Sequence, residues 1–171
     1  MPHKPQLTLR EHVVLALLCE QPRHGWAIAR ELAPGGSIGR IWTVSRPLAY
    51  RAMDDLAARK LIRATGTEQG SGPRRTIYAA TARGRREHEH WLTTPIEHLR
   101  DVRTELLLKL VFGERERRSP RPLLRLQKRA FQPIFVALET AASAPRADVV
   151  DRWRLESARA VQRFLDTAAT P

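Results

Sequence analysis

The sequence predicts a mainly α-helical protein with a small β-hairpin wing, arranged as a winged helix-turn-helix domain over residues 1–92 and a C-terminal helical domain over residues 93–171. Three observations predict this fold. A helix with a defined start follows two shorter helical segments, a pair of strand-like segments comes next, and beyond residue 96 the apolar residues recur only at helical spacing. Two helices joined by a turn and followed by a hairpin are typical of a winged helix-turn-helix.

The first helix is expected from about residue 9 to residue 19. Thr8 followed three residues later by Glu11 forms a capping box, in which each side chain accepts a hydrogen bond from the backbone of the other. The residues behind the cap give an apolar face at helical spacing: Leu9, Val13, Val14, Leu17 and Leu18. We expect a face this broad to serve a core and an interface together.

The second helix is expected to be short, because the segment WAIARELA, residues 26–33, is followed at once by Pro34 and two glycines. The linker that follows carries three apolar residues that are expected to pack beneath the helix pair: Ile41, Trp42 and Val44.

The third helix is expected over residues 45–60. Ser45 is the predicted N-cap, whose hydroxyl would accept a hydrogen bond from a backbone N–H, and Pro47 fits the first turn, where a missing N–H costs nothing. A rotation of about 100° per residue predicts an apolar side made of Leu48, Ala49, Ala52, Met53, Leu56 and the stem of Lys60. The opposite side would carry Pro47, Tyr50, Arg51, Asp54 and Ala58.

The start of this third helix combines charge with the helix dipole. Arg46, Tyr50 and Arg51 lie where the dipole is positive, so they form a candidate surface for phosphates and base edges. The alternative is an ordinary amphipathic helix with a solvated face.

Two strand-like segments, residues 61–69 and 76–80, flank the glycine-rich turn QGSGPRR. A hairpin directly after the third helix is a wing, expected at residues 71–76, and Arg74 and Arg75 at its tip would reach a phosphate or the minor groove. The alternative for this segment is a solvated loop.

The net charge of +12 and the pI near 11.3 favour a polyanionic partner, most often nucleic acid and less often an anionic membrane surface. The charge is spread along the chain: residues 1–92 hold 15 Lys and Arg against 8 Asp and Glu, and the remainder holds 15 against 10. Cys19 is expected to be a small buried hydrophobe. The lack of a signal-like start and of an apolar run near ~20 residues predicts a soluble, cytoplasmic protein.

No enzyme or metal site is expected. His88 and His90 are two residues apart, so on a helix they point to different sides, and we expect them to be solvated. The charges of residues 100–105 read as surface ion pairs. Since the sequence has no catalytic triad order, phosphate loop or metal signature, we predict no catalysis and no cofactor.

Beyond residue 96 three helical segments are expected. The first is amphipathic around Val102 and Leu106, the second restarts at residues 119–120 and should kink at Pro133, and the last carries one apolar side. The residues expected on that last side are Val149, Trp153, Ala160 and Phe164.

Several linked motifs resemble the winged-helix domain of PadR-like transcriptional regulators. They are a Gly25-Trp26 pair opening the second helix, a Tyr-x-x-Leu-x-x-Leu pattern in the third, and a basic wing leading to a Tyr-x-Leu-Thr-x-x-Gly pattern. The matching residues of the last two patterns are Tyr50, Met53, Leu56, Tyr78, Ala80, Thr81 and Gly84. Met53 and Ala80 replace leucines, Lys60 replaces the usual glycine, and Arg46-Pro47 replaces small residues. The C-terminal helices resemble, less specifically, those of the longer branch of this family.

This resemblance implies a homodimeric repressor, joined through the first helix and the C-terminal helices, that binds double-stranded DNA at an inverted-repeat operator and responds to a small-molecule inducer. No inducer or inducer-binding residue follows from the sequence, since each of the four tryptophans is more often a core residue. The expected DNA-binding residues are Ser45, Arg46, Tyr50, Arg51, Arg74, Arg75 and Thr76. Two alternatives stay open: a winged-helix protein–protein interaction module, and a ligand sensor with weak DNA binding.

Overall fold

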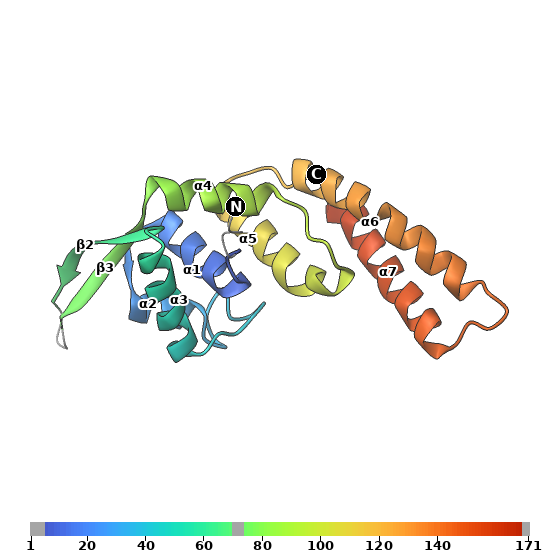
Figure 1. Cartoon of the computed structure of the whole chain (residues 1–171), viewed down its shortest axis with the longest axis horizontal. Helices are drawn as coiled ribbons and strands as arrows, with labels where there is room; N and C mark the ends of the chain where they lie inside the picture. Colours follow the sequence, from blue (N-terminus) through green and yellow to red (C-terminus); the bar gives the residue numbers. More distant parts are fainter. Residues whose placement is uncertain (1–5, 70–73, 169–171) are drawn as a thin grey trace, which may run out of the picture. The chain divides into compact units, whose positions relative to one another are not determined.

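A computed structural model describes residues 6–69 and 74–168 of the chain. The chain divides into two compact units, Met1–Leu92 and Thr93–Pro171. Figure 1 shows that both units are mainly helical and that the strands belong to the first. This arrangement confirms the predicted fold class. Within the described residues no helix is both long and apolar enough to cross a bilayer.

Four helices form the body of the N-terminal unit: α1 (Leu9–Glu20), α2 (Gly25–Glu31), α3 (Arg46–Ala58) and α4 (Ala82–Thr93). The predicted capping box of α1 is confirmed, with the Glu11 N–H donating to Thr8 Oγ1 at 3.3 Å and the Thr8 N–H to Glu11 Oε2 at 2.6 Å. Ser45 is the N-cap of α3, but its hydroxyl makes no capping hydrogen bond, so this part of the prediction is wrong. Pro47 already stabilises the first turn of α3 through its fixed φ.

A three-stranded antiparallel sheet completes this unit, with the order β1-β3-β2. Its strands are β1 (Arg23–His24), β2 (Ile62–Glu68) and β3 (Arg75–Ala80). The β2–β3 hairpin extends away from the helices of the unit (Figure 1). The sequence predicted this hairpin but not β1, because two residues are too few for an alternating pattern. Residues 71–73 of the predicted wing lie outside the described residues.

The core of the N-terminal unit is built around α1. Its residues 13–18 are all fully buried, and α3, which packs against α1, buries Ala49, Ala52, Met53 and Leu56. Leu48, predicted to lie on this apolar side, is 39% exposed. At about 100° per residue Leu48 lies about 40° beyond the edge of the buried stripe, which explains the difference.

The end of α3 explains how the chain turns from helix into sheet. Lys60 adopts a left-handed backbone with φ 58°. The Leu61 N–H donates to the Leu56 carbonyl at 2.9 Å and the Lys60 N–H to the Ala57 carbonyl at 2.9 Å, which is the pattern of a Schellman motif. Glycine is the usual residue at this position, so Lys60 carries a backbone cost that glycine would avoid.

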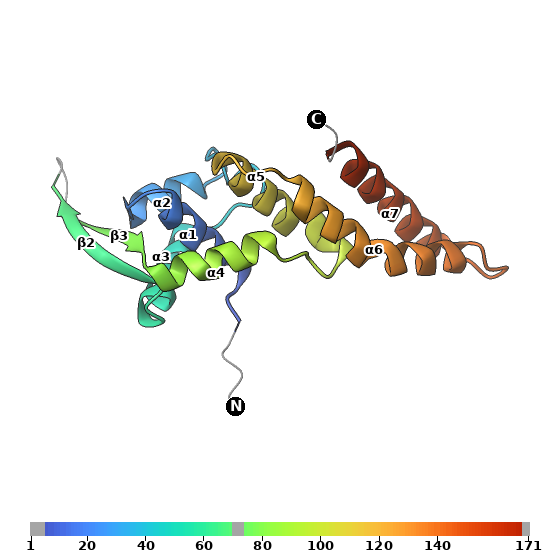
Figure 2. The same cartoon turned by 90° about the horizontal axis from the view of Figure 1, so that it is seen from above.

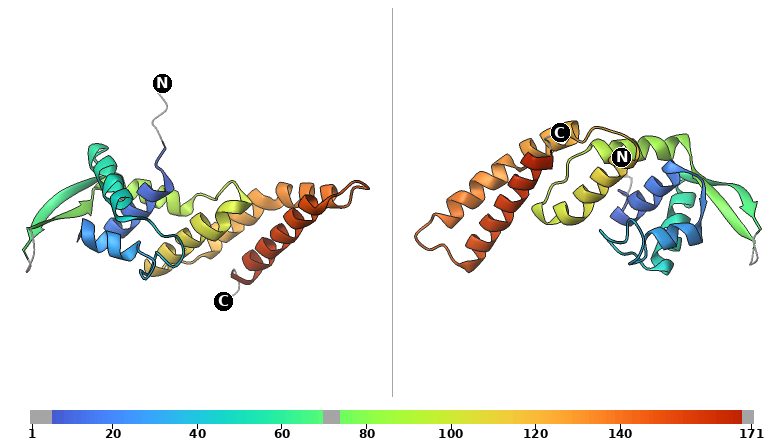
Figure 3. Two further views of the ribbon diagram at one scale, coloured as in Figure 1. Left: turned by 90° about the horizontal axis from the view of Figure 1, so that it is seen from below. Right: turned by 180° about the vertical axis from the view of Figure 1, so that it is seen from behind.

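The C-terminal unit begins with a 3-10 turn and a π-helical turn, η1 (Leu99–Asp101) and η2 (Val102–Leu106), and continues with α5 (Leu107–Arg115), α6 (Arg121–Ala142) and α7 (Val149–Ala168). Helix α6 continues past Pro133 as one helix. Figures 2 and 3 show α6 and α7 lying side by side as a long helical hairpin.

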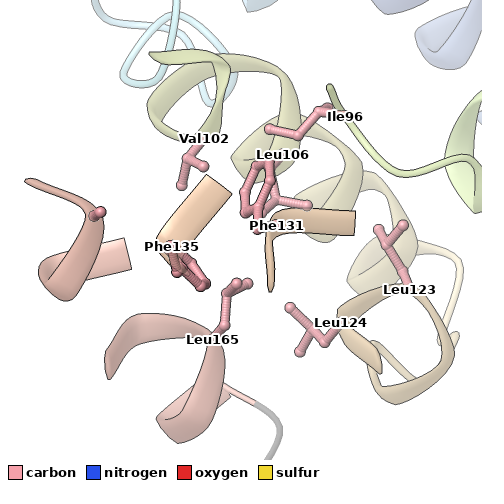
Figure 4. Packing of buried hydrophobic residues seen from close by; sticks show 9 residues of the cluster. Ile96, Val102, Leu106, Leu123, Leu124, Phe131, Phe135 and Leu165 are labelled. Carbon is pink, nitrogen blue, oxygen red and sulfur yellow. The ribbon is translucent and has the colours of Figure 1, made fainter. Parts of the chain in front are cut away.

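One hydrophobic cluster holds this unit together (Figure 4). Phe131 and Phe135 lie at its centre, with ring centroids 6.0 Å apart in an edge-to-face arrangement. Its other members are Ile96, Val102, Leu106, Leu123, Leu124, Ala158 and Leu165. The apolar side predicted for α7 is therefore wrong in part: Phe164 packs against the cluster as predicted, but the buried residues of α7 are Ala158 and Leu165, and Trp153 is 71% exposed. Helix α7 has apolar residues on both sides, so spacing alone could not select the packed side.

Two buried polar side chains bind the segment that precedes η1. Gln127, fully buried, donates from Nε2 to the Ile96 carbonyl at 2.9 Å and accepts the Ile96 N–H at 2.8 Å. Lys109, 3% exposed, donates to the Thr94 carbonyl at 2.7 Å and lies 3.0 Å from Glu105. Burial lowers the pKa of Lys109, and the Glu105 carboxylate opposes this shift.

Candidate nucleic-acid interface

The start of α3 presents an exposed basic surface. Arg46, Tyr50 and Arg51 are all exposed, as predicted from the helical spacing. Within residues 6–69 and 74–168, no carboxylate lies within ion-pair distance of either arginine. Both guanidinium groups can therefore bind an external anion, and the positive end of the α3 dipole favours an anion at this end of the helix.

Ser45 is exposed immediately before α3. Because its hydroxyl makes no capping hydrogen bond, that hydroxyl remains available to an external partner. The prediction that Ser45 lies on this surface is thus compatible with the structure, although the expected capping role is absent.

Tyr50 is held in place by a glycine of α2. A Cβ atom added to Gly25 would lie 2.6 Å from Tyr50 Cε1 and 3.2 Å from Met53 Sδ, so the two helices meet where any larger residue would clash. His24 caps α2 by accepting the Ala27 N–H at its Nδ1, at 3.0 Å. These contacts fix the Tyr50 ring against the start of α2 while 42% of the residue stays exposed.

The predicted wing residues differ in their surroundings. Arg74 is exposed and donates from Nε to Thr67 Oγ1 at 2.9 Å, across the hairpin, and Thr76 is exposed on β3. Arg75 is only half-exposed, because its guanidinium lies over the indole ring of Trp26, with 4.9 Å between the guanidinium carbon and the ring centroid. Arg75 therefore connects the wing strand to α2.

A residue that the sequence analysis missed joins this contact. The guanidinium carbon of Arg30 also lies 4.9 Å from the centroid of the Trp26 ring. Trp26 and Arg30 are four residues apart on α2, a spacing that brings side chains together on a helix. That spacing was the available signal, but the contact with Arg75 comes from the packing of the hairpin against α2.

Two other expectations about titratable residues need correction. His88 is buried, with 4% exposure, and its ring centroid lies 6.1 Å from that of Trp91; α4 turns this side toward the core, so His88 is not solvated as predicted. Cys19 is half-buried at the end of α1, not fully buried. Within the described ranges there is no group of three or more His, Cys, Asp or Glu residues that could hold a metal ion.

Residues 14–90 match the transcriptional regulator PadR-like family. The probable transcriptional regulator Rv1176c of Mycobacterium tuberculosis is 32% identical over 96 residues, which cover 56% of this chain. The matching part spans half the length of that relative.

The crystal structure of Bacillus subtilis PadR in complex with operator DNA is similar in fold. It has a TM-score of 0.50 and 20% sequence identity, and the match covers 97% of this chain and 100% of that chain. The family consists of transcriptional regulators and not of enzymes, in agreement with the predicted lack of catalysis. Residues 14–90 make up most of the N-terminal unit, so this unit matches the transcriptional regulator PadR-like family.

Proposed function

We propose that this protein is a DNA-binding transcriptional repressor that binds an inverted-repeat operator as a homodimer. The observation that carries the proposal is the pair of exposed arginines beside Tyr50 at the start of α3, which have no ion-pair partner among the described residues, in a winged-helix domain that matches this family. The B. subtilis relative of known structure was solved with operator DNA. The N-terminal unit would therefore be the DNA-binding domain and the C-terminal unit the dimerisation domain.

Helix α3 would act as the recognition helix in the major groove. Its 13 residues span about 20 Å at ~1.5 Å per residue, and a groove about 12 Å wide admits a helix with its first turns facing the bases. Arg46 and Arg51 can each donate two hydrogen bonds to a guanine or a phosphate. Ser45 and Tyr50 would add hydroxyl contacts from the same surface.

The wing would contact the DNA next to the recognition helix. Arg74 and Thr76 are exposed on the hairpin, and the hydrogen bond from Arg74 to Thr67 limits the positions that the Arg74 guanidinium can take. Arg75 would act from its position over Trp26. These contacts would be made to the backbone or to the minor groove, and would therefore position the protein more than they select a sequence.

The exposed apolar side chains of the C-terminal unit support the dimer. Trp153 is 71% exposed and Val149 70% exposed on one side of α7, and Leu126, Val136 and Val150 are also exposed. Large apolar side chains exposed on one side of a helix, as Val149 and Trp153 are, are typical of a protein interface. Helix α1 supports the dimer less directly, because residues 13–18 are buried within the chain. Two-fold symmetry would require an inverted repeat with half-sites one or two helical turns apart.

We assign no residues to an inducer. The two alternatives make different predictions about DNA. An interaction module would owe its charge to composition and bind all DNA weakly, and a ligand sensor would bind its ligand much more strongly than DNA. The exposed arginines of α3 favour the repressor, because guanidinium groups at the positive end of a helix suit the phosphates and guanines of DNA.

Fluorescence anisotropy tests the proposal. The protein is titrated into a labelled duplex from upstream of its own coding region and into a scrambled duplex, each over a salt series. We expect tight binding to the upstream duplex alone, with log K falling linearly against log salt because several phosphates are neutralised. Equal and weak binding to both duplexes would contradict specific regulation and favour the interaction module.

A further inference from the structure

Trp26 holds two cations against one aromatic ring. The guanidinium carbons of Arg30 and Arg75 each lie 4.9 Å from the centroid of the Trp26 indole, so the two carbons are at most about 10 Å apart. They come from different elements, α2 and β3, that are far apart in the sequence. We call Trp26, Arg30 and Arg75 the arginine–tryptophan cluster.

The two arginines of the cluster lack a direct ion pair among the described residues, although Glu68 is the register partner of Arg75 and lies 3.6 Å from His24 Nε2. Within the described part of the chain, neither Arg30 nor Arg75 forms an ion pair with a carboxylate. The nearby Arg23, in contrast, lies 2.7 Å from Glu20 and 3.5 Å from Glu31. The indole face attracts both guanidinium groups, but it does not cancel the repulsion between two like charges that are at most about 10 Å apart, within one Debye length at 0.1 M salt. An anion bound by both groups would remove that repulsion.

The position of the cluster indicates which anion it binds. Trp26 directly follows Gly25, on which the Tyr50 ring of the recognition helix packs, and Arg75 lies on β3 between the wing residues Arg74 and Thr76. The cluster thus joins the wing strand to α2, and α2 in turn packs on α3 at Gly25 and Tyr50. A planar guanidinium matches a phosphate diester in shape and charge, and the stacked ring limits the positions that each guanidinium can take.

We propose that Arg30 and Arg75 together bind one backbone phosphate of the DNA between the recognition helix and the wing, with Trp26 as the residue that positions them. Arg30 is then a DNA contact outside the α3 and wing residues named above. The inference rests on the proposed DNA binding. Because the contact is to the backbone, it acts on every DNA sequence alike.

The test is fluorescence anisotropy of the full chain with the upstream and scrambled duplexes, each at several salt concentrations. Arg30→Ala should weaken binding to both duplexes by a similar factor, about 5- to 10-fold at 0.1 M salt, and lower the slope of log K against log salt by less than about 0.9, the full loss being reached when Arg30→Ala is combined with Arg75→Ala. Arg129→Ala is the matched control, because it removes one exposed arginine from α6 and should change neither quantity by that amount.

Two further variants test the cluster as a unit. Trp26→Leu should weaken binding about as much as Arg30→Ala, whereas Trp26→Phe, which keeps an aromatic ring, should restore most of the affinity. The combined loss in Arg30→Ala with Arg75→Ala should be smaller than the product of the two single losses, since both groups bind the same phosphate. Thermal melting checks that each variant folds, and Arg30→Ala, at an exposed position, keeps the test valid if Trp26→Leu does not fold.

The outcomes separate this inference from the proposed function. If the unaltered protein binds neither duplex, both proposals fail. If the unaltered protein binds the upstream duplex specifically but Arg30→Ala behaves like Arg129→Ala, the phosphate site is wrong and the repressor stands. A loss restricted to the upstream duplex would also overturn the inference, because it would assign Arg30 to a base.

Discussion

The two units of this protein differ in what they expose. Around α3 and Trp26, the N-terminal unit exposes arginines without carboxylate partners, and its only exposed large apolar residues in the described part are Leu48 and Tyr50. The C-terminal unit exposes five large apolar residues, Leu126, Val136, Val149, Val150 and Trp153. Both units are basic, so net charge does not distinguish their roles. The exposed side chains do distinguish them. The exposed arginines of the N-terminal unit indicate a polyanionic partner, and the exposed apolar residues of the C-terminal unit indicate an apolar partner.

The largest expected effect is on dimerisation, and it comes from a substitution of Trp153, the exposed tryptophan of α7. Trp153→Arg places a charge in the proposed dimer interface, and we expect it to weaken dimerisation by at least about 2–4 kcal/mol, the range measured for large interface residues. Sedimentation equilibrium measures this change. Arg152→Ala, at the neighbouring exposed position, should leave the dimer intact. A dimer unchanged by Trp153→Arg would show that this side of α7 is not the interface.

The buried glutamine of α6 tests the stability of the C-terminal unit alone. Gln127→Ala leaves the N–H and carbonyl of Ile96 without their partner and opens a small cavity, so it should destabilise this unit by about 2–4 kcal/mol. Urea denaturation measures the loss, with the exposed Gln132→Ala as control. A loss below about 1 kcal/mol would mean that water replaces the amide at Ile96.

The arginine in the second turn of α3 tests base reading by the N-terminal unit. Arg51→Ala should cost about 1–3 kcal/mol of binding to the upstream duplex and much less on scrambled DNA, if Arg51 contacts a base. Anisotropy titrations give both values, and Arg83→Ala, exposed on α4, serves as control. An equal loss on both duplexes would assign Arg51 to a phosphate.

The smallest expected effect concerns the left-handed residues that end α3 and α5. Lys60 and Arg117 both have φ 58°. Lys60→Gly should stabilise the N-terminal unit by about 0.5–1 kcal/mol, because the relief of the left-handed backbone exceeds the entropy that glycine adds to the unfolded chain. Arg117→Gly should do the same for the C-terminal unit, and thermal melting measures both. Destabilisation by Lys60→Gly would show that the lysine side chain makes a larger contribution than its backbone costs.

Local rules predicted the N-terminal unit well. The capping box at Thr8, the start of α3 and the hairpin strands all depend on residues close in sequence, and each was found where it was expected. The missed features depend on packing between distant segments. β1 forms only because β3 lies beside it, and Arg75 meets Trp26 only after the hairpin packs on α2.

In the C-terminal unit, the spacing of apolar residues predicted the helices but not which side of each helix is buried. Helix α7 has apolar residues on two sides, and the side that packs on α6 is the one with Ala158 and Leu165 rather than Trp153. The buried Lys109 could not be predicted either, since lysines are almost never fully buried without a partner and the sequence does not show that the Thr94 carbonyl is near. When a helix has apolar residues on two sides, as α7 does, the element that packs against it decides which side is buried.

Analytical ultracentrifugation of the labelled upstream duplex with the full chain tests the central claim most directly, because it counts chains on DNA. If α3 reads a half-site and the C-terminal helices join two copies, the saturated complex should hold two chains per duplex and should not form with scrambled DNA at the same salt concentration. One chain per duplex, or the same complex with scrambled DNA, would contradict the account.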